Sequence, residues 1–231
     1  MLLRAAGAGF AVYLARRSAK SRFMPGAYVF PGGAVDAADR DEAAFERVFG
    51  SVRGIGLEYA VAALRELFEE AGVLIACRAD GGRVSIPDDT LRDLRRAIAQ
   101  GKHFISLLSE DDLYLDARKL LYYSNWITPA LEPRRFDTHF FVAHPPEGQI
   151  AEADAVELHD GVWLTPHEAL EQAARGELNI VFPTRKHLER MAEFATLDAF
   201  LEHAAERAVR PCEPFVRADG TLDFSPGESA W

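Results

Sequence analysis

One short stretch of this 231-residue chain limits its fold more than any other: Glu66, Glu69 and Glu70 lie close together and Gly72 follows them. In a helix, positions three and four apart share a face, so the three carboxylates would converge. Glycine there would end the helix as a left-handed cap. Clustered carboxylates repel each other without a cation, and Mg²⁺ takes oxygen ligands. We therefore expect a helix from about Leu57 to Ala71 with a divalent-cation site, although a solvated acidic face would show the same pattern.

Residues upstream of this helix extend the pattern. Arg65 to Val73 read R-E-L-F-E-E-A-G-V, and Phe30 to Gly33 read F-P-G-G. Together they resemble the Nudix box, G-x5-E-x7-R-E-U-x-E-E-x-G-U, where U is an aliphatic residue. The second half matches throughout, but Gly33 and Arg65 are 65 − 33 = 32 positions apart instead of 14, so 18 extra residues lie inside the box. Loop closure becomes costly only slowly with length, so such an insertion is tolerable.

The resemblance assigns roles to the box residues. Counted back from Arg65, the first glutamate of the box falls at Leu57, and Glu58 is one position away. Arg65 is expected to orient a glutamate rather than to touch the substrate. The implied ligands of Mg²⁺ or Mn²⁺ are Glu66, Glu69, Glu70 and a backbone carbonyl, that of Gly33 or of Gly32.

A second motif precedes the box. The coenzyme A pyrophosphatases of the Nudix superfamily carry R-[SA]-x3-R-x3-G-x3-F-P-G-G, and this chain resembles them at Arg17, Ser18, Arg22, Gly26 and Phe30 to Gly33. Guanidinium groups suit phosphate oxygens, and coenzyme A carries a 3′-phosphate besides its diphosphate. A solvated basic loop is the alternative interpretation. The resemblance implies substrate contacts from Arg17, Arg22, Gly32 and Gly33.

Later residues resemble one subgroup, the peroxisomal-type acyl-CoA diphosphatases and their bacterial relatives. Trp126 to Pro129 and Arg135 to Phe141 carry this likeness. Arg135 is a candidate phosphate contact, with a structural ion pair at a strand end as the alternative. The general base varies within the family, and Glu157 is our leading candidate, with Glu152 and Asp154 as rivals.

The implied reaction is attack of water on the diphosphate bridge of coenzyme A or acyl-CoA, which yields 3′,5′-ADP and the matching 4′-phosphopantetheine. Hydrolysis of ADP-ribose or a nucleotide sugar would keep the chemistry and change the substrate. A Nudix-fold module that binds a nucleotide without turnover is a third hypothesis. It would be expected to have degenerate ligands, whereas the glutamates here are complete.

Composition narrows the partners. The net charge of −10 argues against nonspecific binding of nucleic acid and requires metal and local arginines to hold a polyphosphate. Two cysteines, Cys77 and Cys212, make no disulfide framework, so a reducing cytoplasm is expected. The apolar N-terminus is interpreted as a strand rather than a secretory signal, and no segment is long enough to span a membrane. Homodimers are common among the relatives that the resemblance suggests.

The resemblance implies an α/β Nudix fold, a mixed sheet in an α/β/α sandwich, and we expect one domain over residues 1–231. We expect a helical insertion over 86–120 and C-terminal helices and tail over 183–231. Predicted strands lie at 9–15, 28–30, 120–128, 138–143 and 156–164. Further predicted helices lie at 88–100, 109–120, 183–194, 197–207 and, opened by the capping box Thr165 to Glu168, from Pro166 to Gly176.

Overall fold

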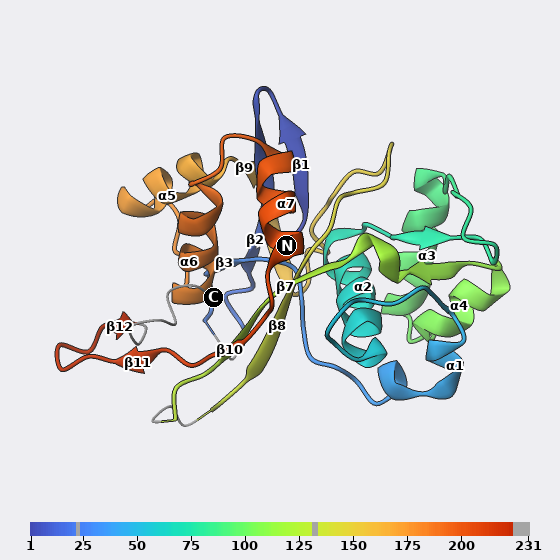
Figure 1. Cartoon of the computed structure of the whole chain (residues 1–231). Helices are drawn as coiled ribbons and strands as arrows, with labels where there is room; N and C mark the ends of the chain where they lie inside the picture. Colours follow the sequence, from blue (N-terminus) through green and yellow to red (C-terminus); the bar gives the residue numbers. More distant parts are fainter. Residues whose placement is uncertain (22–23, 131–133, 224–231) are drawn as a thin grey trace.

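The computed structural model describes residues 1–21, 24–130 and 134–223. Strands form the middle of the molecule, and helices cover them from two sides (Figure 1). One side carries α5 (Pro166–Ala174), α6 (Phe182–Met191) and α7 (Leu197–Glu206). The other carries α2 (Leu57–Ala71), α3 (Asp88–Ala99) and α4 (Phe104–Glu110). A separate cluster of buried apolar side chains fills each side. The arrangement is the predicted α/β/α sandwich.

Strand β2 (Gly9–Arg17) is the centre of the first sheet. Its residues from Phe10 to Ala15 are all buried, as expected for a strand covered on both faces. All of its partners run antiparallel to it: β1 (Leu3–Ala6), β3 (Tyr28–Val29) and β9 (Leu158–Leu164). In the second sheet, β7 (Leu121–Ile127) pairs antiparallel with β8 (Asp137–Val142) and parallel with β10 (Pro211–Cys212), so strand directions are mixed. The five predicted strands are present within two residues of their expected ends.

Helix α2 ends as its sequence predicts. Ala60, Val61, Leu64 and Phe68 are fully buried, because apolar residues recur with the spacing of one helical face. Gly72 then takes φ = 70°, and its N–H donates to the carbonyl of Phe68 at 2.8 Å. A left-handed glycine cap therefore stops the helix just after Glu70.

The segment from residue 86 to 120 is only partly helical. The predicted helix α3 is present, and Gly101 follows it with φ = 91°. The predicted helix over 109–120 is wrong: α4 ends at Glu110, Asp112 takes φ = 49°, and β6 (Tyr114–Asp116) follows. Leu113, just before this strand, and Leu115 on it are buried. Strand pairing therefore prevails over helix propensity there, because β6 lies between β4 (Val48–Phe49) and β5 (Ala76–Cys77) in a small third sheet.

Short elements complete the chain. The segment between Gly33 and Arg65 forms the 3-10 helix η1 (Ala38–Arg40), α1 (Glu42–Phe45) and β4 before α2 begins, and the 3-10 helix η2 (Ala117–Lys119) follows β6. Thr165 and Glu168 make the predicted capping box at the start of α5. A hairpin of β11 (Phe215–Val216) and β12 (Leu222–Asp223) closes the described chain. Among the described residues, none of the helices is both long and apolar enough to cross a bilayer.

Candidate active site

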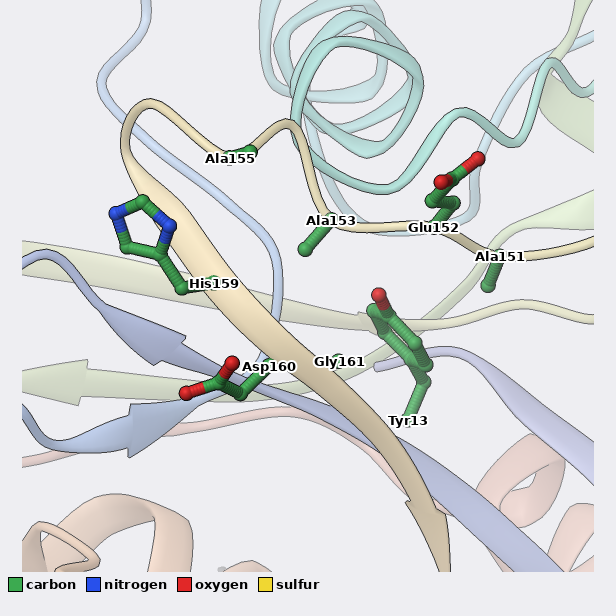
Figure 2. A pocket seen from close by; sticks show the side chains of 8 residues that line it. All are labelled: Tyr13, Ala151, Glu152, Ala153, Ala155, His159, Asp160 and Gly161. Carbon is green, nitrogen blue, oxygen red and sulfur yellow. The ribbon is translucent and has the colours of Figure 1, made fainter.

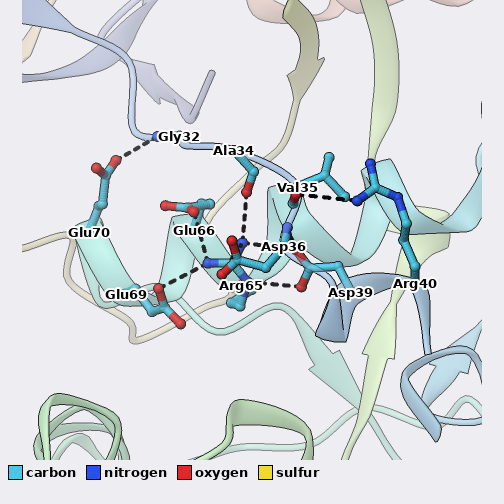
Figure 3. A network of polar contacts seen from close by, with 10 residues as sticks. All are labelled: Gly32, Ala34, Val35, Asp36, Asp39, Arg40, Arg65, Glu66, Glu69 and Glu70. Carbon is cyan, nitrogen blue, oxygen red and sulfur yellow. Dashed lines mark hydrogen bonds and ion pairs between the residues drawn. The ribbon is translucent and has the colours of Figure 1, made fainter. Parts of the chain in front are cut away.

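Arg65 is the centre of a polar network on α2 (Figure 3). Its Nη1 donates to Glu66 Oε1 at 2.8 Å and to Glu69 Oε2 at 3.1 Å. On the other side, Nε and Nη2 each donate to one oxygen of Asp39 at 2.9 Å. Although burial alone would lower the pKa of Arg65, its hydrogen bonds with Asp39 and the charges of the three carboxylates raise it. Arg65 thus stays charged and holds two of the predicted ligands in place, in the orienting role that the sequence suggested.

Asp39 is a site residue that the sequence analysis missed. It is only 2% exposed, and its fork-to-fork pair with Arg65 joins the two halves of the box. Counted forward from Gly33, it lies 39 − 33 = 6 positions on, which is the spacing from the glycine to the first glutamate of the box. The structure therefore places Asp39, and not Glu58, where the first acidic residue of the box belongs. The 18 extra residues lie between Asp39 and Arg65.

Burial perturbs the carboxylates of α2. Burial raises the pKa of Glu66 to about 7, the charge and hydrogen bond of Arg65 oppose the shift, and the charges of Glu69 and Glu157 add to it. Burial likewise raises the pKa of Glu70 to about 8, against the hydrogen bond from Gly32 N–H. Burial also raises the pKa of Glu69. A buried group of carboxylates is costly to ionise unless positive charge is brought to it.

Two glycines bring backbone against these carboxylates. The N–H of Gly32, which has φ = 152°, donates to Glu70 Oε2 at 2.6 Å. A Cβ on Gly33 would collide with the Glu66 carboxylate, so any other residue there would displace the end of that side chain. The F-P-G-G loop is therefore seated directly on the acidic face of α2, as Figure 3 shows for Gly32.

The donor set suits a hard divalent cation. Three carboxylates and the adjacent backbone supply oxygen atoms, the preferred ligands of Mg²⁺ and Mn²⁺. Among the described residues, no three His, Cys, Asp or Glu side chains are already gathered closely enough to hold an ion. The reason is visible in the network: Glu66 and Glu69 turn toward Arg65, and Glu70 turns toward Gly32. Coordination would require these side chains to rotate.

The candidate general bases lie in one loop before β9. Glu157 is exposed, and its negative charge helps to raise the pKa of Glu66 and of Glu70. Asp154 instead accepts from the backbone N–H groups of Glu157 and Leu158 and so shapes the loop. The charge of Asp154 also helps to raise the pKa of Glu70, but among the described residues only the Glu157 carboxylate acts on both Glu66 and Glu70.

Glu152 belongs to a neighbouring cavity of about 290 Å³ (Figure 2). Tyr13 and Gly161 line it together with Glu152, and Tyr13 is 1% exposed. A Cβ on Gly161 would collide with the Tyr13 hydroxyl, which finds no hydrogen-bond partner among the described residues. Burial raises the pKa of Tyr13 to about 12. The cavity adjoins the loop of Glu157 but contains none of the α2 carboxylates.

The predicted substrate arginines lie in two places. Arg17 ends β2, and its guanidinium donates to Ser21 Oγ at 3.0 Å and 3.2 Å, while Ser18 N–H donates to the Glu157 carbonyl. The basic loop is thus joined to the loop of the candidate base. Arg22 lies outside the described residues. Arg135 lies just before β8 of the second sheet. Its guanidinium donates to the Thr128 carbonyl and pairs with Glu213 at 2.9 Å.

A sheet packed on a helix that carries R-E-U-x-E-E, with a glycine loop against its glutamates, is the arrangement of a Nudix hydrolase. Comparisons with known proteins agree. A family model described as the NUDT19 Nudix domain matches residues 54–191. The chain belongs to this family, and it is an enzyme of the Nudix hydrolase class.

Similar proteins cover almost the whole chain. It is 30% identical to the Homo sapiens protein named acyl-coenzyme A diphosphatase NUDT19, over 96% of this chain and 72% of that protein. The Gallus gallus protein of the same name is 27% identical, over 94% and 71%. A crystal structure of a NUDIX hydrolase from Alicyclobacillus acidocaldarius superimposes with a TM-score of 0.77 at 28% identity, covering 87% of this chain and 92% of that one. These likenesses confirm the predicted family and fold.

Proposed function

We propose that this protein hydrolyses the diphosphate bond of coenzyme A or acyl-CoA to 3′,5′-ADP and 4′-phosphopantetheine or its acyl form, with Mg²⁺ or Mn²⁺. The observation that carries the chemistry is the acidic face of α2, where Glu66 and Glu70 meet the F-P-G-G backbone and Arg65 holds Glu69 beside them. The substrate is supported by relatives that are named acyl-coenzyme A diphosphatases and align over most of the chain.

Each residue has a role in this proposal. Glu66, Glu69, Glu70 and the Gly33 carbonyl would hold the metal, which supplies positive charge for the phosphate oxygens when bound. Glu157 takes a proton from water as the water oxygen bonds to phosphorus and the bridging P–O bond breaks. Arg65 keeps Glu66 and Glu69 oriented. Arg17 and Arg22 bind phosphate oxygens, and Arg135 is a more distant candidate for the same task.

We further propose that residues 1–231 form one Nudix domain that works in the cytoplasm as a homodimer. The chain has two cysteines, Cys77 and Cys212, and both are buried, so they are too few for a disulfide framework, which supports a reducing compartment. Phe215 and Val216 on the final hairpin are exposed apolar side chains and are candidates for a subunit contact. Light scattering of the purified protein tests the dimer.

Product analysis tests the activity. The wild type and Glu69→Gln are incubated with Mg²⁺ and a panel of coenzyme A, acyl-CoA, ADP-ribose and an ADP-sugar, and the products are weighed by mass spectrometry. We expect 3′,5′-ADP from the wild type and a loss of about 100-fold or more in Glu69→Gln. Glu171→Gln, an exposed glutamate of α5, is the control and should be fully active.

The other outcomes identify the alternatives. AMP from ADP-ribose with coenzyme A intact would keep the catalytic helix and reject the coenzyme A substrate. No product from any substrate would favour the nucleotide-binding module.

A further inference from the structure

A cavity of about 400 Å³ opens beside Glu69, on the catalytic helix itself. Three segments wall it: residues 36–44, which include the start of the box insertion after Asp39, the α2 residues Arg65 and Glu69, and residues 102–106 where α4 begins. Its size falls within the usual range for small-molecule pockets. Figure 3 shows four of the lining residues, Asp36, Asp39, Arg65 and Glu69, with the polar contacts that connect them.

Packed elements fix the walls of this cavity. Phe104, at the first position of α4, is 6% exposed and stacks on Phe68 of α2 with ring centroids 5.9 Å apart. On the opposite wall, Asp39 is tied to Arg65 by two hydrogen bonds, and Ala44 of α1 is 1% exposed. Both walls are therefore attached to α2, and the space between them exists before any ligand arrives.

The lining combines apolar side chains with an excess of acidic ones over basic ones. Ala38, Ala43, Ala44, Phe104 and Ile105 supply the apolar surface. The charged groups are four carboxylates, Asp36, Asp39, Asp41 and Glu69, against the two cations Arg65 and Lys102. Arg65 already forms ion pairs with four neighbouring acids, Asp36, Asp39, Glu66 and Glu69. A further phosphate group would meet net negative charge here.

The basic loop lies beside a different part of the site. Ser18, next to Arg17, donates its N–H to the Glu157 carbonyl at 2.8 Å, and none of these three residues lines the cavity. A substrate with one highly charged end and one uncharged end therefore meets a basic loop near one part of the site and a cavity without spare positive charge near the other.

We propose that the cavity beside Glu69 binds the uncharged acyl-pantetheine end of the substrate, with the acyl chain against the alanine-lined wall. This inference rests on the proposed acyl-CoA activity and adds the direction in which the substrate binds. The 3′-phosphorylated nucleotide lies toward Arg17, and the thioester end lies toward α1 and α4. The box insertion and the α3–α4 connection then set the preference for acyl-chain length.

Filling the cavity from an exposed position tests this assignment. Ala43 is exposed on α1 and lines the cavity, so Ala43→Phe adds volume without entering the core. We expect kcat/KM for dodecanoyl-CoA to fall by at least about tenfold while that for coenzyme A changes less than threefold. Ala37→Phe is the matched control, because Ala37 is exposed nearby and is not part of the lining. Ala38→Leu repeats the test should Ala43→Phe fail to fold.

The outcomes separate the two proposals. If the wild type cleaves both substrates and the ratio of their kcat/KM values is unchanged in the cavity variants, the acyl-chain assignment is wrong and the proposed function stands. An equal loss on both substrates also rejects it. If the wild type cleaves no coenzyme A derivative, the proposed function fails and this inference fails with it.

Discussion

At the scale of single residues, the site depends on a buried arginine that serves two sets of acids. Arg65 holds Asp39 with one edge of its guanidinium and orients Glu66 and Glu69 with the other. Removing one partner of a buried pair leaves an uncompensated charge, which costs far more than the loss of a surface pair.

Asp39→Asn should therefore lower both stability and activity. We expect the free energy of unfolding to fall by about 3 kcal/mol and kcat by about 10- to 100-fold, since Arg65 would lose its anchor. Urea unfolding and steady-state kinetics measure the two effects. Asp39→Glu, which restores the acid of the box, should recover most of kcat. A variant with Asn and normal kcat would show that Asp39 does not position the site.

Gly33 gives a second test at this scale. A Cβ would lie against the Glu66 carboxylate, so Gly33→Ala should displace that ligand and lower kcat by about 10-fold or more. Stability should hardly change, because Gly33 is exposed. Gly9→Ala is a fair control, since its added Cβ meets only an ordinary contact of 3.5 Å with Ala195 O. Equal kcat values for the two variants would contradict the close approach.

The second half of the box was readable from sequence because its residues lie on one helix with fixed spacing. Asp39 was not, since counting back from Arg65 crosses the insertion and arrives at Leu57. One sequence does not tell on which side of an acidic residue an insertion lies. The ion pair resolves this, because Asp39 is the acid that accepts from the Arg65 Nε among the residues that the structure describes.

At the scale of elements, α3 supports the end of α2. Arg95 of α3 donates to the Glu69 carbonyl at 2.9 Å and to the Glu152 carbonyl at 3.1 Å. It thus satisfies a carbonyl in the last turn of α2, where positive charge is favourable, and ties the helix to the loop that carries Glu157.

Arg95→Gln should lower the free energy of unfolding by about 1–2 kcal/mol. It should also reduce kcat more than it raises KM, because the loop of Glu157 loses a tether. Thermal unfolding and kinetics provide the measurement. Arg92→Gln on the same helix removes only an exposed pair with Asp89 and should change neither quantity. A matching effect of both substitutions would argue against a specific role for Arg95.

Most elements were predictable because local signals agree with the tertiary contacts. Gly72 ends α2, and Thr165 with Glu168 begins α5, as their residue types indicate. The segment 109–120 failed because its pairing partners, β4 and β5, lie far away in sequence. Long-range strand pairing leaves no mark on so short a stretch.

At the scale of the whole molecule, His187 lies where α6 meets both sheets. Its ring is fully buried against Phe30 and Phe140, Nδ1–H donates to the Pro183 carbonyl, and Nε2 accepts from Ser124. Burial lowers the pKa of His187 to about 3. The folded protein thus keeps this ring neutral where the unfolded chain would protonate it.

The unfolded chain binds the extra proton below its ordinary pKa of 6.5, so stability is complete above that pH and falls as pH decreases toward 3. We expect a loss of about 1.4 kcal/mol per pH unit from this group within the window. Unfolding free energies at several pH values should show a shallower slope for His187→Gln than for the wild type. The exposed His167→Gln should keep the wild-type slope, and equal slopes for all three proteins would reject the assignment.

The pair of Asp39 and Arg65 spans 65 − 39 = 26 positions of sequence and only 2.9 Å of space. It holds the two halves of the box together across the loop of residues 40–56, so this loop can vary in sequence while the α2 carboxylates keep their positions. Residues 40–56, which end where α2 begins, are then an exchangeable loop. Replacing this loop with that of a relative should change substrate preference and leave the cleavage chemistry intact. Enzymes built in this way can diversify in substrate without any change to the helix that carries their carboxylates.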